Sequence, residues 1–276
     1  MAVIRITDIK DERVKLFVSM TEAQLRNRLE PEKGIFIAES AKVIRTALEK
    51  GLVPVSMLMP ERHAGGEAAD IIAACPDVPV YTASEEILRE IAGFNVTRGV
   101  LCAMRRPAPL DLEEVCTGKL IVICQGIWDA SNMGAIIRSA AALGADGLLF
   151  ASDCSDPLNR RTVRVSMGTV FQLPWAILGG DTADEIRRIN EMGFATAAMT
   201  LSPDSITLDA FAAQRHDRIA LVMGNEGHGL PDDVSYACTH RVKIPMYHGV
   251  DSLNVAAACA VAVYTLEARG KKQEAR

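Results

Sequence analysis

Arg138 is the residue whose type and position most strongly suggest chemistry. It lies in an apolar stretch with helical spacing, residues 132–145, where its neighbours one turn away are Gly134, Ala141 and Ala142. No carboxylate in this stretch can pair with it across a helical turn. Either its stem lies over apolar surface with the guanidinium in water, or the guanidinium faces a large anionic partner beside a bare helical face. At the start of the stretch, Asn132 is most simply interpreted as a helix N-cap.

A glycine-rich segment, GNEGHG at 224–229, follows an apolar stretch that is typical of a buried strand. Its spacing is neither the G-x-G-x-x-G of dinucleotide-binding folds nor a P-loop, which requires Gly-Lys-Ser/Thr. Glycines adopt positive φ readily, and they let the backbone approach a flat ligand closely. From the glycines alone, the segment is either a ligand-binding loop or a loop that needs unusual dihedral angles.

Asp251, Ser252 and Asn254 form a third polar group, directly before the apolar stretch 255–264. An N-cap would account for one of these side chains, but not for three. The stretch itself, VAAACAVAVY, has no polar face, so a helix here must be covered on every side. Such a helix is either central in its domain or part of a two-fold interface.

These three groups fall in a region where apolar, strand-like segments alternate with helix-like segments. The alternation predicts an α/β domain with a parallel sheet, in which ligands bind at the carboxyl ends of the strands. Helices are expected at 132–145, 161–171, 182–193 and 252–268, with a helical turn at 234–238. Strands are expected at 119–127, 147–151, 174–178, 194–199, 218–224 and 240–246.

A smaller α/β domain is expected before the segment MRRPAPLDLEE at 104–114, whose prolines and arginines indicate a linker. The predicted domains are therefore residues 1–106 and 107–276. In the first of them, helical spacing runs through 17–30, an apolar stretch leads into a helix that ends at Gly51, and a further helix is expected at 84–93. Strands are expected there at 53–59, 78–83 and 99–104.

Composition restricts the class of protein. Of the 276 residues, 49% are hydrophobic and 24% are charged, which is typical of a soluble globular protein. The longest apolar run is too short to cross a bilayer, and the N-terminus has no apolar signal-peptide core, so we expect a cytoplasmic protein without membrane attachment. Seven cysteines without a C-x-x-C pair favour reduced thiols over a disulfide framework or a metal site.

The charge balance limits how the chain could bind a nucleic acid. The formal net charge is −5, whereas phosphate binding relies mainly on cationic side chains. Residues 1–108 carry 15 Lys and Arg against 15 Asp and Glu, so the acidic excess lies in the C-terminal part. Any contact with a nucleic acid must therefore use local basic clusters.

Together and in this order, the three polar groups resemble the three motifs of the SpoU/TrmH family of RNA ribose 2′-O-methyltransferases, over residues 117–268. The motifs N-x-G-x-x-x-R, G-N-E-G-x-G and I-P…S-L-N fall on Asn132, Gly134 and Arg138, then on Gly224, Asn225, Glu226 and Gly229, and finally on Ile244, Pro245, Ser252, Leu253 and Asn254. The segment FIAES and the helix after it are similar to the family's N-terminal substrate-binding domain, which resembles RNA-binding ribosomal proteins. Ser40 stands where glycine is common in that domain, and Ala130 replaces a proline that often follows the first-motif aspartate.

The resemblance implies a SPOUT-type domain with a deep trefoil knot and S-adenosylmethionine (AdoMet) as the cofactor, with no metal. It assigns catalysis to Asn132, Arg138, Glu226, Ser252 and Asn254, and cofactor binding to Gly224, Asn225, Gly229, Ile244 and Leu253. In the family, the first-motif arginine is proposed to abstract the ribose proton with the help of an RNA phosphate. Electrostatic stabilisation of the developing alkoxide would explain the same residue. The resemblance also favours a homodimer that pairs through the expected helices at 132–145 and 252–268.

We compare three functions for this sequence. The first is 2′-O-methylation of RNA, with ribosomal RNA favoured over transfer RNA, because an N-terminal domain of this kind is more usual in members that modify large-subunit ribosomal RNA. The second is a noncatalytic RNA-binding protein that retains the fold, which the intact set of polar motif residues disfavours. The third is a dinucleotide oxidoreductase, which the missing G-x-G-x-x-G after the first strand disfavours.

Overall fold

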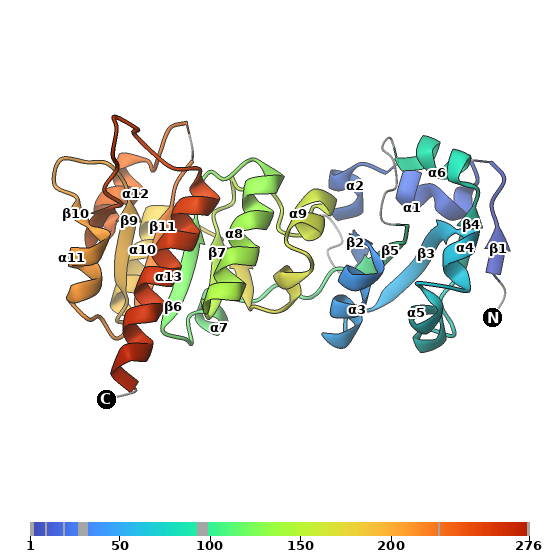
Figure 1. Ribbon diagram of the computed structural model, residues 1–276, viewed down its shortest axis with the longest axis horizontal. Helices are drawn as coiled ribbons and strands as arrows, with labels where there is room; N and C mark the ends of the chain where they lie inside the picture. The colour runs from blue at the N-terminus through green and yellow to red at the C-terminus, as the bar shows by residue number, and fades with distance from the viewer. Residues whose placement is uncertain are drawn as a thin grey trace. The chain divides into compact units, whose positions relative to one another are not determined.

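The structure is a computed structural model, and it describes residues 3–8, 10–18, 20–26, 33–92, 99–225 and 227–274. The chain forms two compact units, each built around its own sheet (Figure 1). The first unit contains Met1–Ala108 together with Pro157–Phe171, and the second contains Pro109–Asp156 and Gln172–Arg276. None of the helices in the described ranges is long and apolar enough to cross a membrane.

The first unit has a mixed five-stranded sheet in the order β1-β4-β3-β5-β2. The β1/β4 and β4/β3 pairs are parallel, whereas β5 runs antiparallel to both β3 and β2. Its strands are β1 (Val3–Arg5), β2 (Ile35–Glu39), β3 (Pro54–Pro60), β4 (Val80–Ala83) and β5 (Leu101–Arg105). Its helices are a 3₁₀ turn η1 (Glu12–Val14), α1 (Lys15–Val18), α2 (Glu22–Arg26), α3 (Ala41–Glu49), α4 (Glu61–Ala64), α5 (Ala69–Ala74) and α6 (Glu85–Ala92).

The segment Pro157–Phe171 belongs to the first unit, although in the sequence it lies between two strands of the second. It contains α9 (Arg160–Val165) and a 3₁₀ turn η3 (Thr169–Phe171). Glu39 at the end of β2 is only 3% exposed, and its carboxylate accepts a hydrogen bond from Arg160 at 3.1 Å and lies 3.6 Å from the Arg164 guanidinium. The rings of Phe36 and Phe171 pack with their centroids 5.4 Å apart. This unit therefore depends on a segment that is distant in the sequence.

The backbone at Ser40 has a conformation that favours glycine. The residue links β2 to α3 with φ of 89° and ψ of 144°, a conformation that is strained for any residue with a Cβ. Its hydroxyl also caps α3 by accepting a hydrogen bond from the backbone of Val43 at 3.4 Å. The serine thus keeps the cap at the expense of backbone strain.

The second unit has a seven-stranded, all-parallel sheet in the order β10-β12-β9-β11-β6-β7-β8. The predicted α/β fold with a parallel sheet is therefore confirmed. Its strands are β6 (Leu120–Cys124), β7 (Gly147–Phe150), β8 (Trp175–Ile177), β9 (Ala195–Met199), β10 (Ile206–Thr207), β11 (Ile219–Met223) and β12 (His240–Lys243). Its helices are α7 (Leu112–Val115), α8 (Ala130–Leu143), α10 (Thr182–Glu191), α11 (Leu208–Ala213), α12 (Asp232–Ala237) and α13 (Val255–Glu274).

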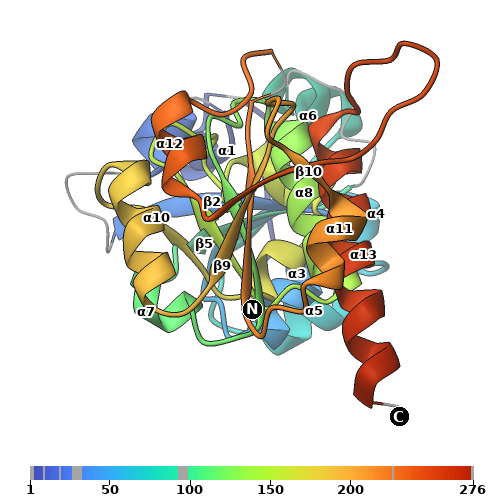
Figure 2. The same ribbon diagram turned by 90° about the vertical axis from the view of Figure 1, so that its left-hand side faces the viewer.

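Helices cover both faces of this sheet, as apolar parallel strands require. Seen along the sheet, α7, α10 and α12 lie on one side, and α8, α11 and α13 lie on the other (Figure 2). Side chains alternate between the two layers along β6, where Ile121 and Ile123 face the core beneath α7, α10 and α12. On the other side, α8 and α13 pack side by side against each other (Figure 1). This arrangement brings two of the polar groups found in the sequence onto neighbouring helices.

Several expected elements differ from those in the structure. The helix expected at 17–30 is wrong as a single element, because two short helices, α1 and α2, replace its described part. The helix expected at 161–171 ends at Val165, since Met167 and Gly168 adopt positive φ of 56° and 81°. The last helix begins at Val255 rather than 252. The short elements β10 and α11 were not expected.

Candidate active site

A cavity of about 350 Å³ lies at the carboxyl edge of the seven-stranded sheet. The loops that follow β9, β11 and β12 enclose it, together with the first turns of α13. It is lined by Met199, Thr200, Leu201, Met223, Gly224, Asn225, Gly229, Val242, Lys243, Ile244, Met246, Asp251, Ser252, Leu253, Val255 and Ala258. All five residues expected to bind the cofactor, Gly224, Asn225, Gly229, Ile244 and Leu253, line this one cavity, and so does Ser252.

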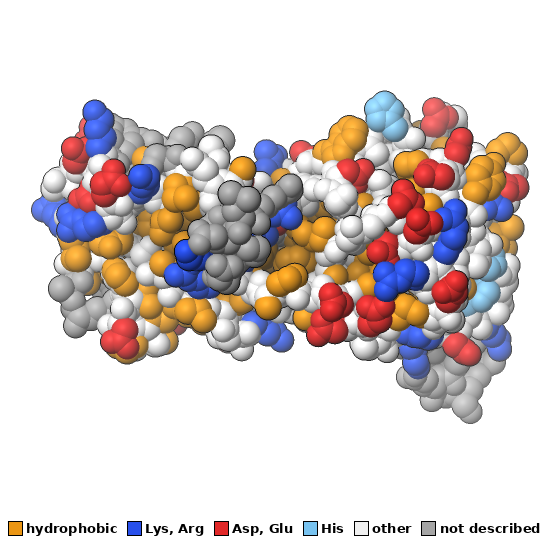
Figure 3. Space-filling model, turned by 180° about the vertical axis from the view of Figure 1, so that it is seen from behind, with side chains coloured by type: hydrophobic (Ala, Val, Ile, Leu, Met, Phe, Trp, Pro, Cys, Tyr) orange, Lys and Arg blue, Asp and Glu red, His pale blue; other side chains and the backbone are white. Residues whose placement is uncertain are grey.

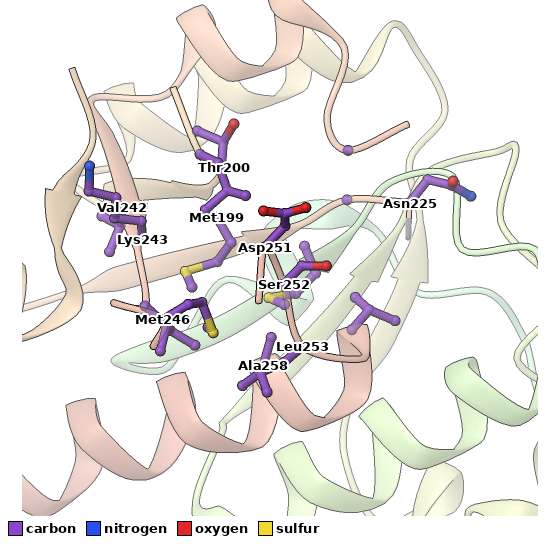
Figure 4. A pocket seen from close by; sticks show the side chains of 16 residues that line it. Met199, Thr200, Asn225, Val242, Lys243, Met246, Asp251, Ser252, Leu253 and Ala258 are labelled. Atoms are coloured by element: carbon purple, nitrogen blue, oxygen red, sulfur yellow. The ribbon is translucent and has the colours of Figure 1, made fainter. Parts of the chain in front are cut away.

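The cavity combines apolar walls with a few polar groups. In the view of Figure 4, Asp251 and Ser252 lie between Met199 on one side and Asn225 on the other. A mostly apolar lining with few hydrogen-bonding groups is typical of sites for small organic ligands. The site can therefore hold an organic molecule with both apolar and polar parts.

Asn225 organises the glycine loop that borders the cavity. Its backbone pairs with that of Gly229 through two hydrogen bonds of 2.8 and 3.0 Å. Its side-chain oxygen accepts hydrogen bonds from the backbones of Gly227 at 2.8 Å and His228 at 3.2 Å. Its side-chain nitrogen donates to the carbonyl oxygen of Gly126, after β6, at 2.8 Å. One amide side chain thus closes the loop and joins it to the loop that leads into α8.

Gly224 allows this loop to fold tightly. A Cβ at this position would lie 2.7 Å from the carbonyl carbon of Gly229 and 2.7 Å from the nitrogen of Leu230. Both atoms belong to the backbone, which cannot move aside as a side-chain tip could. The missing side chain at 224 therefore makes room for the loop itself, whereas the sequence suggested room for a ligand.

Asn132 and Asn254 connect the start of α8 to the start of α13. The side-chain nitrogen of Asn254 donates to the side-chain oxygen of Asn132 at 3.0 Å. The side-chain oxygen of Asn254 accepts hydrogen bonds from the backbones of Ala256 and Ala257, so this residue also caps α13. Two motif residues that are far apart in the sequence therefore meet directly.

The N-cap interpretation of Asn132 is wrong. Asp129 caps α8, because its carboxylate accepts hydrogen bonds from the backbones of Ser131 at 2.8 Å and Asn132 at 2.9 Å. Capping by Asp129 leaves the Asn132 side chain available for its contact with Asn254. The start of α8 thus has one capping residue, Asp129, and one residue, Asn132, that contacts the third motif.

Arg138 is exposed on α8 and does not line the cavity. Among the residues that the structure describes, no carboxylate pairs with its guanidinium. Ala142, one turn further along the helix, is also exposed, so the arginine lies on a surface of small side chains. Its charge is therefore available to an anionic partner outside this chain.

Glu226 lies outside the described residues. Ile244 is partly buried where β12 ends, whereas Ser252 and Leu253 are exposed in the loop before α13. No cluster of three or more His, Cys, Asp or Glu that could hold a metal occurs within the described ranges.

Sequence reasoning did not identify the contribution of β9. Met199, Thr200 and Leu201 line the cavity because β9 lies between β11 and β12 in the sheet. The apolar segment 194–199 was recognised as a strand, but its neighbours depend on the strand order, which alternation alone does not determine. Asp251 belongs to a recognised polar group, yet the motif comparison left it without a role.

The sheet and the cavity together define an α/β domain that binds an organic ligand at the carboxyl edge of its parallel strands. The chain belongs to the SpoU rRNA methylase family, whose family model matches residues 119–264. This result confirms the resemblance that the three motifs suggested.

Relatives and solved structures extend the similarity to almost the whole chain. A relative from Mycobacterium bovis, described as an uncharacterized tRNA/rRNA methyltransferase, is 37% identical over 94% of this chain and 90% of its own length. The 23S rRNA (guanosine-2′-O-)-methyltransferase RlmB of Ralstonia nicotianae is 31% identical over 70% of this chain and 78% of that protein. The crystal structure of an AdoMet-bound rRNA methyltransferase from Sinorhizobium meliloti is 26% identical, with a TM-score of 0.79 over 96% of this chain and 97% of that one.

Proposed function

We propose that this chain transfers a methyl group from AdoMet to a ribose 2′-hydroxyl of RNA, with ribosomal RNA preferred over transfer RNA. The observation that carries the proposal is the contact between Asn132 and Asn254 beside the cavity, because it joins the first and third motifs. Membership of the SpoU family and the similarity to RlmB support the reaction type and the ribosomal substrate.

The cavity fits AdoMet in size and in chemistry. Its volume of about 350 Å³ lies within the range of small-ligand sites, roughly 300–1,000 Å³. Apolar side chains such as Met223 and Val242 suit a flat heterocycle, and Thr200, Asn225 and Asp251 offer hydrogen bonds to polar groups. When bound, AdoMet supplies a methyl group activated by a sulfonium centre.

Arg138 acts on the ribose side of the reaction in this proposal. The 2′-hydroxyl must lose its proton as its oxygen accepts the methyl group, so negative charge develops on that oxygen. A guanidinium stabilises this charge, although by itself it is a poor base because it stays protonated in proteins. Its exposure and its lack of a carboxylate partner in the described ranges leave the charge free for this role, with an RNA phosphate as the candidate proton acceptor.

Asn132, Ser252 and Asn254 hold the ribose and the arginine in position. The hydrogen bond between the two asparagines fixes their amide groups, so that the first and third motifs meet the substrate in one geometry. We propose that Glu226 helps to hold the motif loops and Arg138 in place, as the resemblance implies.

A homodimer completes the site in this proposal. Along α13, Ala257, Val261 and Tyr264 are exposed and follow one another at helical spacing. Val261 is 41% exposed and Tyr264 is 64% exposed, so this apolar stripe has no cover within the described chain. We propose that a second copy covers the stripe and contributes Arg138 to its partner's site.

The remaining parts of the proposal concern the rest of the chain. We propose two functional domains, residues 1–106 and 107–276, of which the first binds the RNA substrate, and we propose a cytoplasmic location. The deep trefoil knot is proposed for the region that contains loops 224–230 and 244–254, and the family match over that region supports it. The face of α10 and α12 carries interspersed charges that include several carboxylates (Figure 3), so it is a poor surface for RNA phosphates.

Incubation of the purified protein with tritiated AdoMet and ribosomal RNA from a strain that lacks the gene tests the proposal. A 2′-O-methyl group blocks alkaline cleavage, because that cleavage needs the free hydroxyl, so the label must appear in alkali-resistant dinucleotides. Transfer RNA is the matched alternative substrate. Label that appears in alkali-sensitive nucleotides would contradict ribose methylation, and RNA binding without any label would favour the noncatalytic alternative.

A further inference from the structure

Trp128 is exposed beside the active site. Its side chain is 61% exposed, although tryptophan is usually well buried. The indole ring faces the ring of His228, with centroids 6.4 Å apart and planes inclined at 59°. Trp175, the other tryptophan of the chain, is partly buried and packs edge-on against the buried Phe150. An exposed aromatic pair on two loops of the site indicates a binding partner outside the described chain.

The backbone that leads into Trp128 is held by several hydrogen bonds. The carbonyl oxygen of Gly126 accepts a hydrogen bond from Asn225, and the backbone nitrogen of Gly126 donates to Asp153 at 3.0 Å. Ile127 donates to the Cys154 sulfur at 3.4 Å and accepts a hydrogen bond from the backbone of Ser155 at 2.8 Å. The backbone that carries the indole is therefore already ordered, which reduces the loss of conformational freedom on binding.

His228 is placed just as firmly on the opposite loop. Its backbone nitrogen donates to the Asn225 side chain at 3.2 Å, and the same side chain donates to Gly126. Asn225 thus sets the spacing between the two aromatic residues. The motif comparison gave His228 no role, because it occupies a variable position within the second motif.

The pair lies on the ribose side of the site. Trp128 directly precedes Asp129, which caps α8, and Asn132 lies in the first turn of the same helix. Neither Trp128 nor His228 lines the cavity assigned to AdoMet. The position of the pair therefore matches a group attached to the ribose better than it matches the cofactor.

We propose that Trp128 and His228 form a stacking platform for an unpaired base of the RNA substrate next to the reacting ribose. The inference rests on the proposed function, because it takes RNA as the substrate. RNA-binding proteins commonly hold unstacked bases against aromatic side chains, and such stacking tolerates any base. A stacked base fixes the nucleotide, so that the ribose is oriented toward Asn132 and Asn254.

The expected effect of the platform can be stated as a fold-change. Loss of one stacked base weakens binding by roughly 5- to 150-fold. Trp128→Ala should therefore raise the KM for RNA by a factor within that range, whereas Trp128→Phe should have a KM close to that of the wild type. His228→Ala should show a smaller rise. Tyr236→Ala is the matched control, because Tyr236 is 67% exposed on α12, outside the site loops, and its loss should leave the KM unchanged.

Fluorescence provides a test that does not depend on catalysis. In a Trp175→Phe variant, Trp128 is the single tryptophan, and titration with a short oligoadenylate should quench its emission. An abasic oligomer of the same length carries the same phosphates without bases, and it should quench much less. The affinity for AdoMet, measured by calorimetry, should be the same for Trp128→Ala and wild type.

Each contrary result identifies a different error. Equal quenching by the abasic oligomer, or an unchanged KM for Trp128→Ala, would overturn the stacking platform while leaving RNA methylation intact. Quenching by AdoMet alone would assign the ring to the cofactor, and emission that changes with protein concentration would assign it to a dimer interface. If oligoadenylate quenches the Trp128 emission but the wild-type protein transfers no methyl group, the proposed function is refuted and the stacking platform is retained.

Discussion

Gly224→Ala is expected to weaken AdoMet binding through the loop and not through a direct clash with the cofactor. The new Cβ would lie 2.7 Å from the backbone of Gly229 and Leu230, whereas non-bonded carbon atoms prefer roughly 3.5–4.0 Å. The loop must therefore retreat by about 0.8 Å or more. Such a shift would lengthen the two hydrogen bonds between Asn225 and Gly229, now 2.8 and 3.0 Å, beyond the bonding range.

The expected rise in the Kd for AdoMet follows from the loss of those two hydrogen bonds. Each contributes about 0.5–1.5 kcal/mol, so the loss of both amounts to about 1–3 kcal/mol. If AdoMet needs the closed loop, this free energy must be supplied on binding, and the Kd should rise roughly 5- to 150-fold. Isothermal titration calorimetry measures the Kd, and thermal unfolding of the same samples verifies that the variant is folded.

The loop provides its own controls. Gly227→Ala places a Cβ 3.5 Å from the Asn225 side-chain oxygen, an ordinary contact, so its Kd should stay within about twofold of wild type. Gly229→Ala meets open space but keeps φ of 71°, so strain of about 1 kcal/mol should raise the Kd about fivefold. A wild-type Kd for folded Gly224→Ala, or an equal loss for Gly227→Ala, would refute the reasoning.

Four further predictions concern other parts of the chain. Arg138→Ala should abolish methyl transfer and leave the AdoMet affinity, measured by calorimetry, nearly unchanged. Arg138→Lys should restore little activity, because an ammonium group lacks the planar fork of a guanidinium. A large loss of AdoMet affinity would place Arg138 in the cofactor pocket. Asn254→Asp should keep the cap of α13 and the unfolding midpoint in urea. It should lose most activity, because a carboxylate cannot donate a hydrogen bond to Asn132. Full activity would show that this hydrogen bond is dispensable. Ser40→Gly should raise the free energy of unfolding in urea by about 1 kcal/mol by relieving the strain at φ of 89°, whereas Ser40→Ala should lower it by about the same amount. Val261→Lys should give inactive monomers in sedimentation experiments, and an active monomer would refute the composite site.

Val261 is a better position for this charge than Ala258, although Ala258 lies in the middle of the apolar stretch 255–264. In the structure, Ala258 lines the cavity, so a charge there would disturb the site directly. The sequence showed that the helix lacks a polar face, but only the packing against α8 and β11 shows which side is left exposed.

Much of the second unit could be predicted because its signals are local. Apolar segments such as 119–127 and 218–224 become central parallel strands, and the polar groups that follow strands come together at one edge. The site contacts that were missed depend on distant neighbours. Thr200 reaches the cavity through the strand order, and Asn132 is released for Asn254 because Asp129 takes the cap.

Positive φ at non-glycine residues accounts for another group of differences. Met167 interrupts the helix expected at 161–171, and helical spacing gives no warning of such a residue. At Ser40, by contrast, the departure from a common glycine was visible in the sequence, and the structure supplies the reason in the backbone angles. A substitution pattern can thus mark a strained position before its geometry is known.

The discontinuous make-up of the first unit has a consequence for how the protein is made. A ribosome releases residues 1–108 first, yet Arg160 and Arg164, which neutralise the buried carboxylate of Glu39, are synthesised only after β6, α8 and β7. An uncompensated buried charge is strongly destabilising, so the N-terminal half must wait for residue 171 before it reaches its final stability. Synthesis of the first unit is therefore completed from within the sequence of the second unit, and a chain released between residues 108 and 157 leaves neither unit finished.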